Sequence, residues 1–366
     1  MKKRLEYFDV AKGIGVFLVL VGHLQGDDVF QYSPYILPFC EWIFSFHMPF
    51  FFIISGMLIS YRNDMSKDMK DIAKRRFKGI MIPYYWFSFF YMTVVIAAYF
   101  NKQIIFQNVI LNVWYVLSCY GMNVLWFLPA AFFGELLFIF IMKKLDTKKA
   151  VAVIALQCVV ALVLAYLLRQ GTYDTTIKEG AKELATTVLR PFIVCSFTAI
   201  GYFGFTLINS IDKREATDEK PSISVKELLI GVALMVVGAL LVRINHGVDF
   251  RSLVFKNVPA YYVCSLATSF GLILICKNIK PFKLLKFWGV NSLIFMAAHA
   301  SQKAISFAIQ AAMWCNQFLT RARGYICYAI IISIVALYTS IMIILINKFV
   351  PFIAGKPFKG FKKASN

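Results

Sequence analysis

Long apolar runs alternate with short polar segments along the chain, and each run has the length of about 20 residues that crosses the hydrocarbon core of a bilayer as an α-helix. This pattern predicts an all-α, polytopic membrane protein with about ten transmembrane helices. The predicted spans cover residues 8–25, 38–60, 80–100, 123–142, 150–168, 189–208, 226–243, 258–276, 288–313 and 325–347.

The basic residues between the runs predict the orientation of the chain, because cytoplasmic loops carry an excess of Lys and Arg. Basic clusters precede the first span, follow the second span at 62–78, and recur after every second span from there on. In contrast, residues 25–37 contain no Lys or Arg. We therefore expect both termini in the cytoplasm and one integral membrane domain over residues 1–366, in the cell membrane.

The composition agrees with a lipid environment and argues against other classes. Hydrophobic residues make up 60% of the chain and charged residues 16%, which is too apolar for a soluble domain of this size. The net charge of +20 does not indicate a nucleic-acid partner, because the basic residues form separate clusters between spans. The eight Cys lack metal-ligand spacing, so we expect neither a disulfide framework nor a metal site.

The first span contains ionisable residues that a bilayer disfavours. Lys12 and His23 are eleven positions apart, which places them on one face of a helix with about 16 Å between them along its axis. Asp9 lies one turn before Lys12 and can pair with its ammonium group. Two interpretations stay open. Either Lys12 reaches the inner headgroups and His23 the outer interface, or the two line a path across the membrane with His23 as general base.

Further polar residues fall inside later spans. His47 is followed two positions later by Pro49, which removes a backbone hydrogen bond, so the freed group must line a cavity or find a partner in a neighbouring helix. The alternative is a satisfied core histidine beside an ordinary kink. The fourth and ninth spans add another set of polar residues: Glu135, Asn291, Ser292, His299 and Lys303.

Several motifs follow one another in a fixed order. They are Tyr7-Phe-Asp9-Val-Ala-Lys12-Gly13 with Gly22-His23, FHMPFFFIISG at 46–56, Arg75-Arg76-Phe-Lys78 before Ile82-Pro83-Tyr84, Trp126-Phe-Leu-Pro129, and Gly289-Val-Asn291-Ser292-Leu before His299. With this set the chain resembles the acyltransferase-3 family of membrane acyltransferases, which move acetyl or similar groups onto cell-surface carbohydrates and other acceptors. Where the family often has Arg, this chain has Lys12 and Lys78, which keep the charge but lack the planar, bidentate guanidinium.

The resemblance implies an O-acetyltransferase-like enzyme without a permanently bound cofactor. It would move an acyl group, acetyl by default, from cytoplasmic acyl-CoA to a hydroxyl of an extracytoplasmic carbohydrate or lipid-linked glycan. The expected catalytic residues are His23, Lys12 and His47. The expected donor-binding residues are Arg75, Arg76 and Lys78, for which plain positive-inside charge or contact with membrane lipid is the alternative. The residues expected to line the shared cavity are Asp9, Glu135, Asn291, Ser292 and His299.

Two questions stay open at the level of the sequence. The acyl group can pass directly or rest covalently on a histidine. The competing class is a non-enzymatic transporter or flippase, in which buried His, Glu135 and Lys303 serve proton coupling. A transporter of the inverted-repeat type should carry matching broken helices in two halves. The informative residues concentrate instead in the first two spans and the ninth, which favours the enzyme.

Overall fold

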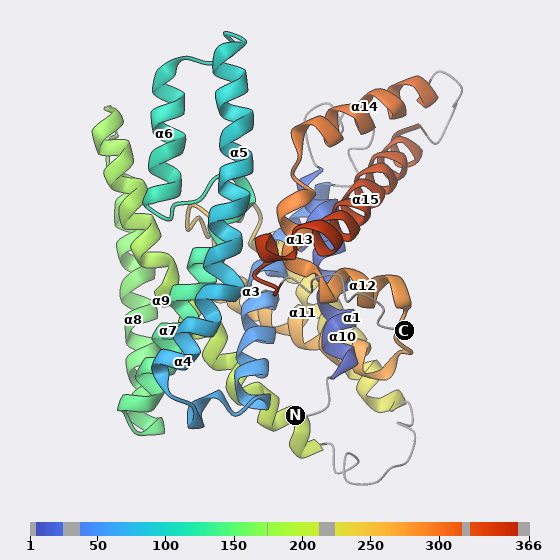
Figure 1. The fold of residues 1–366 in the computed structure, drawn as a ribbon. Coiled ribbons are helices and arrows are strands. Elements are labelled where there is room, and N and C mark those ends of the chain that lie inside the picture. The colour runs from blue at the N-terminus through green and yellow to red at the C-terminus, as the bar shows by residue number, and fades with distance from the viewer. Residues whose placement is uncertain (1–4, 25–36, 174, 212–223, 317–322, 358–366) are drawn as a thin grey trace, which may run out of the picture.

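The computed structural model describes residues 5–24, 37–173, 175–211, 224–316 and 323–357. Helices dominate this part of the chain (Figure 1). The α-helices are α1 (Glu6–His23), α3 (Leu37–Tyr61), α4 (Met69–Arg76), α5 (Ile82–Phe100), α6 (Phe106–Leu117), α7 (Phe127–Lys144), α8 (Thr147–Gln170), α9 (Thr176–Ile211), α10 (Val225–Leu241), α11 (Val258–Asn278), α12 (Lys283–Val290), α13 (Ser292–Ala298), α14 (Gln302–Asn316) and α15 (Arg323–Phe349).

Eight helical segments of the described part are long and apolar enough to cross a membrane. They comprise α3, the continuous segment from α4 to α5, and α7, α8, α9, α10, α11 and α15. This confirms the predicted all-α, polytopic membrane fold. α1 has 18 residues but is less apolar than these eight, because it contains Glu6, Asp9 and Lys12.

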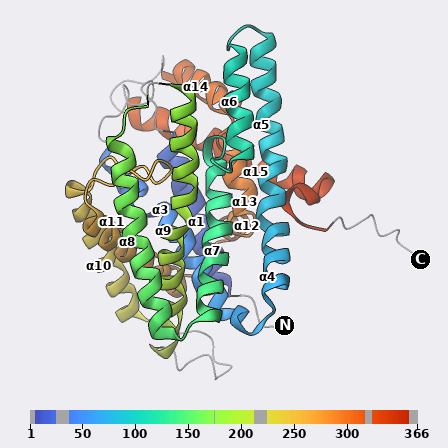
Figure 2. The same cartoon turned by 90° about the vertical axis from the view of Figure 1, so that its left-hand side faces the viewer.

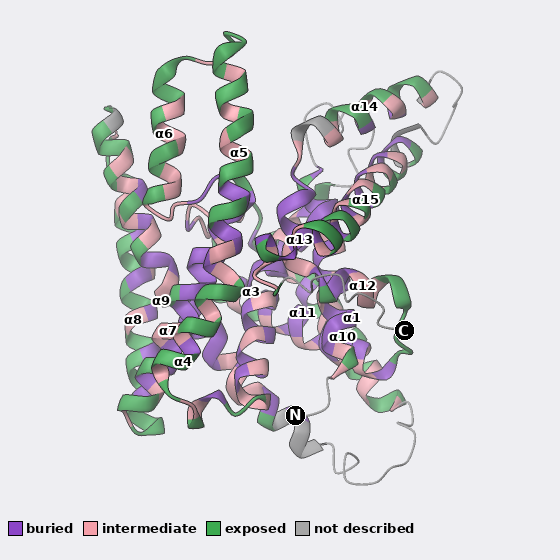
Figure 3. Cartoon of the chain, viewed as in Figure 1, coloured by how far each residue is buried: buried purple, intermediate pink, exposed green. Residues whose placement is uncertain are grey.

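The helices divide into a buried centre and an apolar periphery (Figure 3). In α3 and α7, 72% of the most apolar window is buried, whereas the corresponding share is 22% in α8 and 17% in α10. The exposed side chains of α8 and α10 are mainly Leu, Val and Ile. Such surfaces suit lipid as the surrounding solvent, so polar side chains that need protein partners lie on the central helices.

α4 continues into α5 through a π-helix over Phe77–Met81. α6 then folds back alongside α5, and the two helices form a hairpin that projects beyond the other helices (Figures 1 and 2). No residue of α6 is buried. The hairpin therefore adds little to the core, and the polar chemistry lies at its base and in the central helices.

Close backbone contact joins α1 to α12. A Cβ atom added at Gly13 would lie 1.9 Å from the carbonyl oxygen of Leu285, and one added at Gly289 would lie 1.7 Å from that of Asp9. Neither position has room for a side chain. The small residues thus let the two helices approach closely, as is common inside membranes.

The predicted single span over 288–313 is wrong, because the chain breaks twice there. The first break is at Asn291, whose backbone leaves helical geometry with φ −111° and ψ 23°. Its side-chain amide donates to the carbonyl of Phe287 at 2.9 Å, a local bond that competes with helix continuation. The second break lies between α13 and α14 at 299–301. Broken helices are tolerated at membrane depth where protein covers them, and most of α13 is buried.

Candidate active site

Three histidines from three separate elements meet at one point. His23 ends α1, His47 lies within α3, and His299 follows α13. The ring centroid of His23 is 6.0 Å from that of His47 and 5.3 Å from that of His299. Phe44 packs edge-on against both His23 and His47. The structure therefore brings together three of the predicted site residues.

Each of these rings is held by its own helix. Nδ1 of His23 lies 2.9 Å from the carbonyl oxygen of Val19, and Nδ1 of His47 lies 2.9 Å from that of Ile43. His299 makes the equivalent bond to Phe295 at 3.3 Å. A carbonyl only accepts, so Nδ1–H donates in each case. In the neutral form of each ring, Nε2 then carries the lone pair that can accept a proton.

The three rings differ in their access to the surface. His47 and His299 are buried, and Nε2 of His299 has no hydrogen-bond partner among the described residues. His23 is exposed at the surface, although one side of its ring is enclosed by Phe44 and the other two imidazoles. Of the three rings, His23 is therefore the one accessible from the surface, and the two buried rings pack against it.

Pro49 leaves a carbonyl in α3 without its helical donor, as the sequence indicates. That carbonyl belongs to Ser45, four positions before the proline, and it accepts a hydrogen bond of 2.7 Å from the hydroxyl of Ser265 in α11. The partner in a neighbouring helix fixes the α3 backbone beside His47.

Lys12 lies apart from the imidazoles. Its Nζ is ion-paired with Asp9 at 3.1 Å, and 20% of its side chain is exposed against 3% for Asp9. Eleven residues of helix, or about 16 Å, separate Lys12 from His23 along α1. The structure places the two on one helix as predicted, but it does not bring Lys12 or Asp9 into contact with the histidines.

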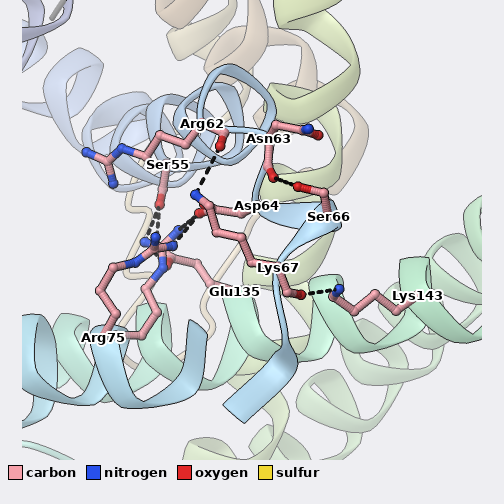
Figure 4. A network of polar contacts seen from close by, with 10 residues as sticks. Ser55, Arg62, Asn63, Asp64, Ser66, Lys67, Arg75, Glu135 and Lys143 are labelled. Carbon is pink, nitrogen blue, oxygen red and sulfur yellow. Dashed lines mark hydrogen bonds and ion pairs between the residues drawn. The ribbon is translucent and has the colours of Figure 1, made fainter. Parts of the chain in front are cut away.

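The predicted donor-binding arginines already have carboxylate partners (Figure 4). Arg75 donates to Asp64 at 2.6 Å, and Arg76 forms an ion pair with Glu135. The hydroxyl of Ser55 also donates to Glu135. This network ties α4 to α3 and α7. Glu135 therefore belongs to an ion-pair network rather than to the lining of the imidazole cluster.

Asp64 is fully buried in this network and lies outside the spans. Burial alone would raise its pKa, but hydrogen bonds from Lys67 and Arg75 and the positive charge of Arg75 lower the pKa below the ordinary value of 3.8. Asp64 is therefore a carboxylate that holds its cations at neutral pH. Lys78, by contrast, is exposed on the π-helix that follows α4.

Asn291 takes part in a second polar cluster at the end of α15. Its Oδ1 accepts hydrogen bonds from Asn347 at 2.9 Å and from Lys356 at 2.8 Å. Asn347 and Lys356 line a pocket of about 310 Å³ together with Lys348, Pro351 and Pro357. Asn291, at one end of α13, is thus bonded to two residues that line this pocket, while His299 joins the imidazoles at the other end.

Gly355 connects this pocket to the basic segment after α4. Its φ is +67°, and a Cβ atom there would lie 2.1 Å from the carbonyl oxygen of Lys78. Glycine is favoured at this position for both reasons. Of the remaining predicted residues, Ser292 is half-buried at the start of α13, and the side chain of Lys303 lies outside the described residues.

Sequence reasoning missed one further group of polar residues. Arg190 is only 1% exposed and Glu183 only 7%, both in α9, and Arg251 lies in the loop before α11. The signal was available, because Arg190 falls inside the predicted span 189–208 and a charge within a span is unusual.

The fold and the site together define a polytopic membrane protein whose central helices hold a cluster of neutral imidazoles, one of them accessible. A family model described as an acyltransferase domain, Acyl_transf_3, matches residues 5–345. The chain therefore belongs to the acyltransferase-3 family, as the sequence motifs indicate. Membership of this family favours an acyltransferase over a non-enzymatic transporter.

Two curated relatives are similar over shorter stretches. The nodulation protein NolL of Mesorhizobium japonicum is 31% identical over 136 residues, which are 36% of this chain and 34% of that protein. The nodulation protein NolL of Sinorhizobium fredii is 34% identical over 103 residues, or 26% of each chain. The alignments thus span about a third or less of these relatives. No solved structure matches the chain.

Proposed function

We propose that this acyltransferase moves an acetyl group from acyl-CoA, bound from the cytoplasm, to a hydroxyl of a carbohydrate on the outer side of the cell membrane. His23 acts as the general base. The observation that carries the proposal is the geometry of His23, whose Nδ1 is bonded to Val19 while its ring remains accessible. Its Nε2 is thereby available to a substrate hydroxyl.

In the proposed reaction, Nε2 of His23 takes the proton of the acceptor hydroxyl as the oxygen attacks the thioester carbonyl carbon. A C–O bond forms and the C–S bond breaks, so the products are an O-acetyl ester and the CoA thiol. The imidazolium returns its proton to the leaving thiolate. The neighbouring rings of His47 and His299 are neutral in this scheme and exclude water from His23.

The donor is proposed to bind at the pocket next to Asn291, which the short helix α13 separates from the histidines. Phosphate groups of CoA require cations, and Lys348 and Lys356 line the pocket there while Lys78 lies in the segment next to it. The face of α1 from Lys12 to His23 is the proposed route for the acyl-bearing arm. Arg75 and Arg76 would then hold α4, and with it the following segment that carries Lys78, in place through Asp64 and Glu135.

The test is acetyl transfer by the full chain in membranes supplied with radiolabelled acetyl-CoA, with label counted in surface polysaccharide. Replacing His23 by Ala should reduce transfer about 10²- to 10⁴-fold with unchanged insertion and thermal stability. His246→Ala is the matched control, because that histidine lies in an exposed loop bonded to Lys256, and it should retain activity. Full activity of His23→Ala would end the proposal.

A further inference from the structure

Two arginines share one aromatic ring at the end of the molecule where His23 lies. The guanidinium carbons of Arg190 and Arg251 lie 4.6 Å and 4.9 Å from the ring centroid of Tyr120. Arg190 also lies over Trp126 at 5.3 Å. Each guanidinium can interact favourably with the ring, yet the two positive charges are thereby held close to one another.

Backbone carbonyls fix both side chains in place. Arg190 donates to the carbonyl oxygens of Arg251 at 2.8 Å and Tyr120 at 2.9 Å. Arg251 donates to the carbonyl oxygen of Gly121 at 3.0 Å. The site is therefore built from α9 and two loops, and its geometry does not depend on a mobile surface lysine or arginine.

The hydrogen bonds of this group are incomplete within the described part of the chain. Glu183 and Asp249 interact electrostatically with the arginines, but no ion pair to Arg190 or Arg251 occurs there, and Nη2 of Arg190 and Nε of Arg251 are buried without a hydrogen-bond partner. Glu183 is also buried, and its Oε2 has no hydrogen-bond partner. A buried donor or acceptor without a hydrogen-bond partner is costly, and such groups often mark a place where something binds.

This group lies close to the histidines. Asp249, two residues before Arg251, interacts electrostatically with both His23 and Arg190. Phe250 stacks on Trp126 at 5.7 Å and contacts Phe52 of α3 at 5.6 Å. One layer of aromatic side chains therefore separates the arginine pair from the helix that carries His47.

We infer that Arg190, Arg251 and Glu183 form an acceptor subsite. The two guanidiniums bind an oxyanion of the acceptor, and the carboxylate of Glu183 accepts from one of its sugar hydroxyls. Paired guanidiniums are well suited to carboxylate and phosphate oxygens. The inference rests on the proposed function in one respect, because it assigns the acceptor of that reaction: a sugar with a carboxylate or a phosphate.

The test measures the thermal unfolding of the purified full chain with three sugars: D-glucuronate, D-glucose 1-phosphate and D-glucose. A ligand of the folded state raises the unfolding temperature. We expect a rise with one or both acidic sugars and none with D-glucose. Glucuronate alone identifies a carboxylate as the anion, glucose 1-phosphate alone identifies a phosphate, and a rise with neither overturns the subsite.

Variants then locate the binding. Arg251→Gln should weaken the binding of the sugar that raises the unfolding temperature by about tenfold or more, since it removes charge-assisted hydrogen bonds. Arg190→Gln should do the same if it folds. Lys256 is exposed on the same loop, so Lys256→Gln is the control. It should keep the full rise in unfolding temperature with the sugar. Equal shifts in Arg251→Gln and in the control would overturn the assignment.

The two proposals fail separately. His23→Ala should keep the acidic-sugar shift while losing acetyl transfer. A chain that shows the shift but no transfer in any acceptor assay contradicts the proposed function and leaves the subsite intact. A chain that transfers acetyl but shows no shift contradicts the subsite alone.

Discussion

Two pairs of arginines at opposite ends of the molecule have different bonding partners. Arg75 and Arg76 each have a carboxylate within ion-pair distance, in Asp64 and Glu135. Arg190 and Arg251 donate to backbone carbonyls and share Tyr120, without an ion pair in the part of the chain that the structure describes.

The difference separates two uses of the same side chain. An arginine whose charge is balanced by a buried carboxylate joins helices, and it has less capacity left for a ligand. An arginine held rigidly without an ion pair keeps N–H donors free for an anion from outside. The comparison therefore favours a structural role for Arg75 and Arg76 and a ligand-binding role for Arg190 and Arg251.

The largest expected effect is on the balanced pair. Glu135→Ala leaves Arg76, whose side chain is 11% exposed, without its main partner, and breaking a largely buried pair in this way costs about 3 kcal/mol of unfolding free energy. Thermal or denaturant unfolding of the purified chain measures it. Glu179→Ala, at an exposed position of α9, should change stability by at most about 0.5 kcal/mol. Similar values for the two variants would contradict the structural role of Arg76 and Glu135.

Double-variant cycles sharpen the contrast. Arg76→Met and Glu135→Leu should show a coupling energy of about 0.5–3 kcal/mol, because each removes the partner of the other. Arg190→Met and Glu183→Leu should show a smaller coupling energy, since the two side chains interact electrostatically but form no ion pair. Strong coupling in the second cycle would mean that Glu183 balances Arg190 directly.

Acid should lower the stability that Asp64 contributes through its ion pairs with Lys67 and Arg75. The pKa of Asp64 is lowered in the folded chain, so its contribution to stability is fully present above about pH 5 and is lost as the pH falls through its folded pKa, below 3.8. The gap in unfolding temperature between the wild type and Asp64→Asn should therefore be constant from about pH 5 upward and shrink in stronger acid. A gap that does not change with pH contradicts this assignment.

The smallest effect concerns the donor. Lys78→Gln should raise the KM for acetyl-CoA about two- to fivefold, as suits the loss of one exposed charge contact, with kcat nearly unchanged. Lys148→Gln, an exposed lysine at the start of α8, is the matched control. Equal KM values in the two variants would favour contact with anionic lipid as the role of Lys78.

Much of the fold follows from the sequence, because lipid requires long apolar helices and leaves few other solutions. The prediction failed at 288–313, where composition indicates one span. Besides its local bond to Phe287, the side chain of Asn291 at the break accepts hydrogen bonds from Asn347 and Lys356, which lie far along the chain. Such tertiary partners leave no trace in local hydropathy.

The site was predictable to the extent that single residues revealed it. Histidines inside spans are unusual enough to mark His23, His47 and His299, and the structure brings them together. Spacing along one helix placed Lys12 on the face of His23 but gave no reason for contact. The pairing of Arg76 with Glu135 and the stacking of Arg190 on Tyr120 arise from helix packing, which the sequence pattern does not encode.

The hydrogen bond from Ser265 to the carbonyl of Ser45 has a consequence for biosynthesis. Translation delivers α3 to the membrane long before α11, so the nascent chain must hold a bare carbonyl in lipid or shield it temporarily. His299 emerges later still. The imidazole cluster and the support of its central helix are thus complete only once the last third of the chain has been inserted.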